Sequence, residues 1–298
     1  MERKLAIVIF TSVFLIGSLC SPVLAKHDKG NENVPVYYLS LGTSLAAGVQ
    51  ADPLTGESVV TDVSYPSILA EILSQDIRKL RHINLGCPGE TAESFICGGK
   101  CEYPHGSQLD QAVRFLHAHG KFTGLITIDL GANDVLQCVD ETGIDPVCVS
   151  NTLLQLSADL SDILETLREV APGVPIVGMN YYNPLLALYF EDQNFAESTI
   201  MFQLSINLTL ESVYAAYGVP VADVAGVFKS YDLLTDDNSD GIPDSVELVC
   251  AWTWMCEFWN IHAKDTGYAA IAGEFVSVLS EIPISMPPRK RLRNNGHR

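Results

Sequence analysis

Short apolar runs alternate with longer amphipathic segments along most of this 298-residue chain. The short runs predict buried strands, and the segments between them repeat apolar residues at helical spacing. Strands that alternate with helices form a parallel sheet covered by helices on both faces, so the sequence predicts a three-layer α/β/α domain. The expected strands are 36–41, 83–85, 125–130, 175–179 and 219–224, and the expected helices are 66–80, 108–118, 153–170, 199–217 and 268–279.

The two ends of the chain differ from the body between them. A basic start, an apolar run over residues 5–19 and the small-residue site at 23–25 are typical of a secretory signal peptide. An uncleaved membrane helix is the weaker interpretation, because the run is short for a bilayer span. We therefore expect a secreted protein with a signal peptide over 1–25, a folded domain over 26–286 and a basic, solvated tail over 287–298.

Net charge excludes two classes of partner. The full chain carries −18; the first 25 residues contribute +1 and the last ten contribute +5, which leaves −24 for the residues between them. A body this acidic repels nucleic acid and anionic lipid surfaces. We therefore expect no nucleic-acid partner and no stable membrane anchor.

The cysteines predict disulfides. Cys20 lies in the expected signal peptide, and a secreted protein pairs most of the remaining seven. Cys138 with Cys148 and Cys250 with Cys256 would close short loops, whereas Cys101 could pair with Cys87 or Cys97. A zinc site is the weaker interpretation of these cysteines, because the sequence has no C-x-x-C spacing.

Four short segments hold residue types that ester hydrolysis requires. They are GTSLAAG at 42–48, NLGCPGET at 84–91, GAND at 131–134 and HAKDTGY at 262–268, and they contain Ser44, Gly89, Asn133 and His262. This set resembles the SGNH (GDSL-type) esterase/lipase family, which is named for these four residues, from about residue 34 to residue 282. The resemblance implies a five-stranded sheet in flavodoxin-like order, a Cys87–Cys101 pair and no cofactor for catalysis.

Three of the four residues directly follow predicted strands. Ligand sites of open α/β sheets lie at the carboxyl ends of the strands, so Ser44, Gly89 and Asn133 should meet at one edge. Ser44 is the expected nucleophile and His262 its base. The backbone amides of Ser44 and Gly89 and the side-chain amide of Asn133 are the expected oxyanion donors. The competing interpretations are a helix cap for Ser44 and turn residues for Gly89 and Asn133.

Two positions depart from the family pattern. Thr43 stands where the family usually has Asp, and Trp259 stands three residues before His262, where the family often has the Asp that orients the histidine. Asn260 is nearer to the histidine. Our hypothesis is that the backbone carbonyl of Trp259 accepts the hydrogen bond from His262 Nδ1. Ser44 has no G-x-S-x-G elbow around it, which argues against the ordinary α/β-hydrolase fold.

A second motif is independent of the first. DDNSDGIPDSVE over 236–247 fits the calcium-loop pattern D-x-[DN]-x-[DN]-G-x5-E. A structural calcium would stabilise the segment that leads to His262, and the alternative is a solvated acidic loop. The expected calcium ligands are Asp236, Asn238, Asp240, the Ile242 carbonyl, Asp244 and Glu247.

The segment at 181–186, Tyr-Tyr-Asn-Pro-Leu-Leu, follows the fourth strand and could line an acyl pocket or pack in the core. Together these observations predict a secreted serine esterase or lipase whose partner is a small ester or a lipid. A carbohydrate deacetylase or a phospholipase of the same fold is an alternative. A non-catalytic, calcium-stabilised binding protein is the alternative from another class.

Overall fold

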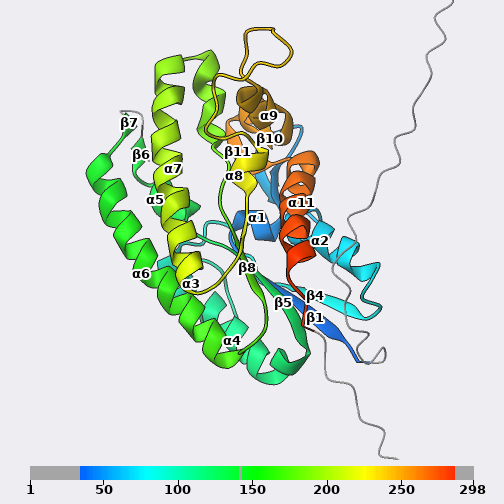
Figure 1. The fold of residues 1–298 in the computed structure, drawn as a ribbon. Coiled ribbons are helices and arrows are strands. Elements are labelled where there is room, and N and C mark those ends of the chain that lie inside the picture. Colours follow the sequence, from blue (N-terminus) through cyan, green and yellow to red (C-terminus); the bar gives the residue numbers. More distant parts are fainter. Residues whose placement is uncertain (1–33, 141–142, 286–298) are drawn as a thin grey trace, which may run out of the picture.

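A five-stranded parallel sheet forms the centre of the molecule (Figure 1). The computed structural model describes residues 34–140 and 143–285, so the expected signal peptide at 1–25 and the tail at 287–298 lie outside the described residues. The strand order is β4-β1-β5-β8-β9, which is the predicted flavodoxin-like order, and every neighbouring pair is parallel. The strands are β1 (Val36–Gly42), β4 (Leu80–Asn84), β5 (Thr123–Asp129), β8 (Ile176–Met179) and β9 (Val221–Ala222).

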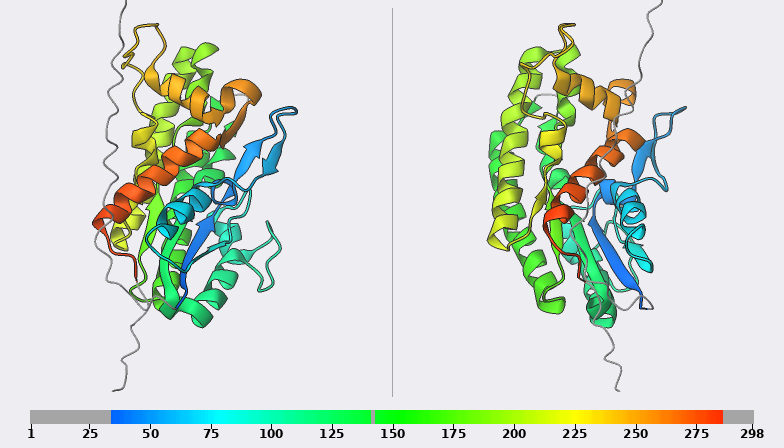
Figure 2. Two further views of the ribbon diagram at one scale, coloured as in Figure 1. Left: turned by 90° about the vertical axis from the view of Figure 1, so that its right-hand side faces the viewer. Right: turned by 45° about the vertical axis from the view of Figure 1, so that its right-hand side comes forward.

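Helices cover both faces of this sheet, as predicted (Figures 1 and 2). One face carries α2 (Tyr65–Ser74) and α11 (Asp265–Glu281), and the other carries α4 (Gln108–His119), α6 (Pro146–Val170) and α7 (Gln193–Ala216). The central strand β5 is buried along its whole length, because helices lie on both sides of it. Its continuous apolar character follows from that position.

Three helix boundaries lie six or more residues from the expected positions, and local residues explain two of them. Asp145 caps α6 ahead of Pro146, and Asp192 caps α7, so both helices begin earlier than their apolar periodicity indicated. In contrast, α2 ends at Ser74, although Ile77 beyond it is still buried. Apolar periodicity therefore continued past the end of that helix.

The shorter elements lie mostly at the carboxyl edge of the sheet. The hairpin β2–β3 lies beside the segment from α9 to β11, and Asn260 Nδ2 donates to Ser58 Oγ across that contact at 3.0 Å (Figure 2). None of the helices within the described residues is long and apolar enough to cross a membrane. The elements are α1 (Ser44–Ala47), β2 (Val49–Ala51), β3 (Ser58–Val60), α3 (Ala92–Cys97), the 3-10 helix Gly120–Phe122, α5 (Ala132–Leu136), β6 (Val139–Asp140), β7 (Gly143–Ile144), the 3-10 helix Pro184–Phe190, α8 (Val224–Val227), α9 (Asp244–Trp252), β10 (Thr253–Trp254), α10 (Met255–Phe258) and β11 (Asn260–Ala263).

Three disulfides cross-link the described part of the chain, and they are the three expected pairs. They are Cys87–Cys101, Cys138–Cys148 and Cys250–Cys256, and Cys97 is the exposed free cysteine of the described residues. The first closes the loop that contains Gly89. The last joins α9 to α10, directly before the strand that holds His262. Two of the three cross-links thus lie beside segments that hold expected site residues.

Candidate active site

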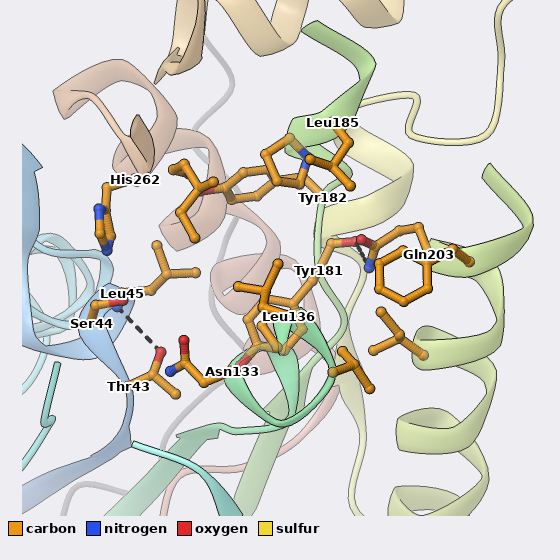
Figure 3. A pocket seen from close by; sticks show the side chains of 16 residues that line it. Thr43, Ser44, Leu45, Asn133, Leu136, Tyr181, Tyr182, Leu185, Gln203 and His262 are labelled. Atoms are coloured by element: carbon orange, nitrogen blue, oxygen red, sulfur yellow. Dashed lines mark hydrogen bonds between the residues drawn. The ribbon is translucent and has the colours of Figure 1, made fainter. Parts of the chain in front are cut away.

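A cavity opens at the carboxyl edge of the sheet, and Ser44, Asn133 and His262 all line it (Figure 3). The three residues come from α1, α5 and β11, which are far apart in sequence. Of the three residues predicted to meet at one edge, Ser44 and Asn133 line this cavity, and His262 joins them from a different element. The other lining residues are mostly apolar: Thr43, Leu45, Ala132, Val135, Leu136, Tyr181, Tyr182, Pro184, Leu185, Phe202, Gln203, Ile206 and Ile261.

Ser44 lies in a tight turn between β1 and α1. Gly42 has φ +136°, and a Cβ there would lie 2.4 Å from the Asp129 carbonyl oxygen, so only glycine fits. The N-cap of α1 is Thr43, whose hydroxyl accepts a hydrogen bond from Leu45 N at 3.4 Å. Ser44 is therefore the first helical residue and does not act as the cap. Its side chain lies on the cavity wall instead.

Asp129 lies beneath this turn, and sequence reasoning did not identify it. Its carboxylate accepts hydrogen bonds from Thr43 N at 2.8 Å, Thr43 Oγ1 at 2.6 Å and Tyr65 Oη at 2.8 Å. Burial raises the pKa of Asp129 to about 7, and the bonds from Thr43 and Tyr65 oppose that rise. An aspartate at position 43 would place a second carboxylate beside Asp129. The departure at Thr43 therefore has a local physical reason.

Gly89 follows Pro88 in a β-turn that a bond from Glu90 N to Cys87 O closes at 3.2 Å. Gly89 has φ +78°, the value that the third position of a type II turn requires. Cys87 N donates to Gly42 O at 3.0 Å, which joins this turn to the start of the Ser44 turn. Gly89 itself is not among the residues that line the cavity.

Asn133 connects to the same turn through its side chain. Its Nδ2 donates to the backbone carbonyl of Glu90 at 2.9 Å. A carboxamide nitrogen has two N–H groups, so this bond orients the side chain and leaves a second donor. Asn133 and the Gly89 turn are thereby held as one unit at the cavity.

His262 has its ring directed toward Ser44 (Figure 3). Its Nδ1 lies 2.6 Å from Asn260 Oδ1, and the same oxygen accepts from His262 N at 3.1 Å. Asn260 Nδ2 donates to Ser58 Oγ, which assigns the oxygen to the histidine side. An acceptor opposite Nδ1 requires the hydrogen on Nδ1, so Nε2 carries the lone pair. This is the tautomer that a base toward Ser44 needs.

The expected role of Trp259 is wrong. The partner of His262 Nδ1 is the Asn260 side chain, whereas the prediction was the Trp259 backbone carbonyl. Trp259 has φ +54° and is 57% exposed, because it turns the chain from α10 into β11. Asn260 then folds back onto its own backbone two residues later, which asparagine side chains do readily. Asparagine two residues before the histidine was the available sequence signal.

Several contacts fix the strand that holds His262. Tyr182 Oη donates to Ile261 O at 2.5 Å, and Lys264 Nζ donates to Cys250 O at 2.9 Å.

Burial lowers the pKa of His262 to about 4. At neutral pH the ring is therefore uncharged and able to accept a proton.

The residues at 181–186 divide between the two roles considered for them. Tyr181, Tyr182, Pro184 and Leu185 line the cavity, whereas Leu186 packs in the core. Asn183 is buried, and its Nδ2 donates to Thr199 Oγ1 at 2.8 Å. The segment thus forms both cavity wall and core.

The expected calcium loop forms a compact turn before α9. Asp236 Oδ2 accepts from Gly241 N at 2.9 Å, and Asn238 Nδ2 donates to the Glu247 carboxylate at 3.0 Å and 3.2 Å. Lys229 Nζ pairs with Asp244 Oδ2 at 2.5 Å. Within the residues that the structure describes, no group of three or more acidic, histidine or cysteine side chains is arranged to hold a metal ion. Asn238 and Glu247, two of the expected ligands, do meet, but Asn238 directs its amide nitrogen to the carboxylate, while its Oδ1, the atom that calcium would bind, accepts from Asp240 N at 2.9 Å.

Comparisons with known proteins identify the family and the fold of this chain. A sequence profile of the GDSL-like Lipase/Acylhydrolase family matches residues 40–270. No curated protein matches the chain by sequence.

Three solved structures illustrate the similarity of fold. An extracellular lipase from Streptomyces rimosus is 19% identical, with a TM-score of 0.54, 83% of this chain covered and 99% of that one. A phospholipase A1 from Streptomyces albidoflavus is 18% identical, with a TM-score of 0.51 and the same coverage of 83% and 99%. A mutant of an acetyl-xylooligosaccharide esterase from Geobacillus is 13% identical, with a TM-score of 0.50 and coverage of 83% and 94%. At these identities the similarity establishes the fold alone.

The burial of His262 predicts how it titrates. Its ring should gain a proton only as the pH falls toward about 4, well below the ordinary histidine value. An Asn260→Asp variant would place a carboxylate opposite Nδ1, favour the charged ring and raise this pKa by about one unit or more. NMR titration of the ring resonances checks both values, with the signal assigned by its loss in His262→Asn. A wild-type midpoint near 6.5, or no upward shift in Asn260→Asp, would contradict this account of the ring's surroundings.

Proposed function

Because the chain belongs to the GDSL-like Lipase/Acylhydrolase family, we propose that it is a secreted serine hydrolase that cleaves carboxylic esters. One observation carries the proposal: Ser44, Asn133 and His262, from three distant segments, line a single cavity. Secretion is supported by the three disulfides, since such bonds persist in oxidising compartments.

In the proposed reaction, Ser44 Oγ attacks the carbonyl carbon of the ester while its proton passes to His262 Nε2. The carbonyl oxygen becomes an oxyanion, which would accept hydrogen bonds from the Ser44 and Gly89 amides and from Asn133 Nδ2. Collapse of this intermediate expels the alcohol, which takes the proton from His262. Water then hydrolyses the acyl-enzyme by the same steps, and no cofactor enters the reaction.

Asn260 would orient the base without charging it. A carboxamide oxygen opposite Nδ1 holds the ring and its tautomer, as a carboxylate does in other hydrolases. It stabilises the imidazolium less than a carboxylate would, and burial disfavours that charge further. The His262 ring of the proposed enzyme therefore strongly prefers its neutral form, so it can still act as the base at mildly acidic pH.

The walls of the cavity favour an apolar acyl group. Beyond Ser44 the lining includes Leu45, Leu136 and Leu185, together with Phe202 and Ile206 from α7. Apolar walls of this kind bind hydrocarbon by excluding water. An acetyl group has little hydrocarbon to bury against such walls, so esters of longer acyl chains would gain more from them than acetylated carbohydrate. Esterase, lipase and phospholipase substrates share that acyl chemistry.

We also propose that residues 236–247 bind one calcium ion with a structural role. The ligands would be Asp236, Asn238, Asp240, the Ile242 carbonyl, Asp244 and Glu247. The contact between Asn238 and the Glu247 carboxylate supports this assignment, because the first and last parts of the loop already meet there. For the full set to form, Lys229 would have to release Asp244 and Asn238 would have to turn its Oδ1 toward the ion.

The proposed activity predicts a strict dependence on Ser44. Wild-type protein should hydrolyse p-nitrophenyl esters, with kcat/KM higher for medium acyl chains than for acetate. Ser44→Ala and His262→Ala should lower kcat by about 10⁴-fold or more, because each removes part of one proton-transfer pair. Ser74→Ala, an exposed serine on α2, is the matched control and should match wild type. Equal rates for wild type and Ser44→Ala would contradict the enzyme proposal and favour the alternative of a non-catalytic binding protein.

The calcium proposal predicts measurable uptake. Titration calorimetry of EDTA-treated, dialysed protein with CaCl₂ should give one site, and calcium should raise the thermal midpoint by mass action. Glu247→Gln should weaken binding at least about tenfold, since it removes the charged bidentate ligand. Glu71→Gln, an exposed glutamate on α2, is the control. No heat of binding together with an unchanged midpoint would leave the loop as a solvated acidic turn.

A further inference from the structure

Gln108 is a fully buried polar residue at the start of α4 that the proposed reaction does not use. It is not among the residues that line the cavity. Its Oε1 accepts from Gly42 N at 2.6 Å, and its Nε2 donates to Gly42 O at 3.0 Å. One carboxamide thus binds both backbone groups of the glycine that begins the Ser44 turn.

The same side chain also reaches the second loop of the site. Gln108 Nε2 donates to Glu90 Oε2 at 2.8 Å, and Glu90 is only 1% exposed. Ser94 Oγ donates to the other carboxylate oxygen at 2.5 Å. Glu90 has Gly89 as its neighbour, and its own carbonyl accepts the bond from Asn133 Nδ2. A single carboxamide therefore connects to all three expected oxyanion donors.

Loss of these hydrogen bonds would carry a large free-energy cost, because the groups that they join are buried. Gly42, Glu90 and Gln108 are buried, so loss of the bond to Gly42 N or to Glu90 would leave a polar group without water, whereas Gly42 O would keep the bond from Cys87 N. The partners also differ in the hydrogen-bonding groups that they require. Gly42 requires one donor and one acceptor, whereas the Glu90 side chain requires a donor. A carboxamide supplies both, whereas a carboxylate or an alkyl side chain at this position cannot.

We propose that Gln108 is a positioning residue that holds the Ser44 and Gly89 amides and the Asn133 side chain at the spacing of a single oxyanion. This inference rests on the proposed function. It adds that the oxyanion site depends on a residue that does not touch the substrate. Preorganised donors act because they need not move as the charge develops, so loss of the clamp should affect the transition state more than substrate binding.

Gln108→Glu tests this assignment, because it keeps the acceptor for Gly42 N and removes both donated bonds. We expect kcat to fall about 10- to 100-fold, less than the roughly 100- to 1,000-fold loss caused by removing a direct oxyanion donor. KM should change by less than about threefold. The Ki of an alkyl trifluoromethyl ketone, which forms a tetrahedral adduct with a serine, should rise by a factor similar to the fall in kcat.

Two further variants separate positioning from damage to the fold. The double variant E90Q/Q108E restores a donor and an acceptor between these positions with their roles exchanged, and it should regain at least about threefold in kcat over Gln108→Glu. Gln193→Glu makes the same substitution at an exposed position, the first residue of α7, and should stay near wild type. If Gln108→Glu does not fold, Gln108→Asn, which adds no charge, is measured in its place.

The outcomes distinguish this inference from the proposal on which it rests. An active wild type with an inactive Ser44→Ala, but unchanged kcat and Ki in folded Gln108 variants, would overturn the positioning role alone. A loss confined to KM or to the thermal midpoint, with Ki unchanged, would also overturn it. A wild type without esterase activity would overturn the proposed function and this inference together.

Discussion

The parallel pairing of β1 with β5 is the contact on which the whole site depends. It sets Gly42 opposite Asp129, at the ends of the two most central strands. Asp129 then receives both hydrogen-bonding groups of Thr43 and the Tyr65 hydroxyl, which fixes the turn that presents Ser44. Such close approach is possible only because residue 42 is glycine. The sheet therefore fixes the position of the proposed nucleophile to a greater degree than helix α1, which has only four residues, could do.

The proposed base reaches the site by a different physical route. No strand of the central sheet holds His262; its segment is fixed by a disulfide, by hydrogen bonds from Tyr182 and Lys264 to the backbone, and by contact with the hairpin β2–β3. The ring is partly buried, which lowers its pKa to about 4, and Asn260 fixes its tautomer without adding charge. The molecule thus combines a rigid strand-end platform with a separately anchored histidine. The proposed chemistry requires Ser44 on the platform and His262 on its own segment to be correctly positioned relative to each other.

The sequence predicted the layered architecture because buried strands appear as short apolar runs and helices as apolar residues at helical spacing. The family resemblance implied the strand order and the Cys87–Cys101 pair, and the structure has both. Ser44, Asn133 and His262 line one cavity. Contacts between distant side chains had no such signal. In the sequence, Asp129 is an ordinary strand end and Gln108 an ordinary helix start. Their hydrogen bonds to Thr43 and Gly42 depend on how distant segments are placed in the fold. The partner of His262 was missed for a local reason, because the turn at Trp259 directs the Asn260 side chain to the ring.

The central claim is that three distant segments form one oxyanion site around an ester bound to Ser44. A crystal structure of the protein after reaction with an alkyl phosphonate ester tests it most directly. Phosphorus should be bonded to Ser44 Oγ, and the phosphoryl oxygen should lie about 2.7–3.1 Å from Ser44 N, Gly89 N and Asn133 Nδ2. An adduct on another residue, or a phosphoryl oxygen directed away from these donors, would contradict the account.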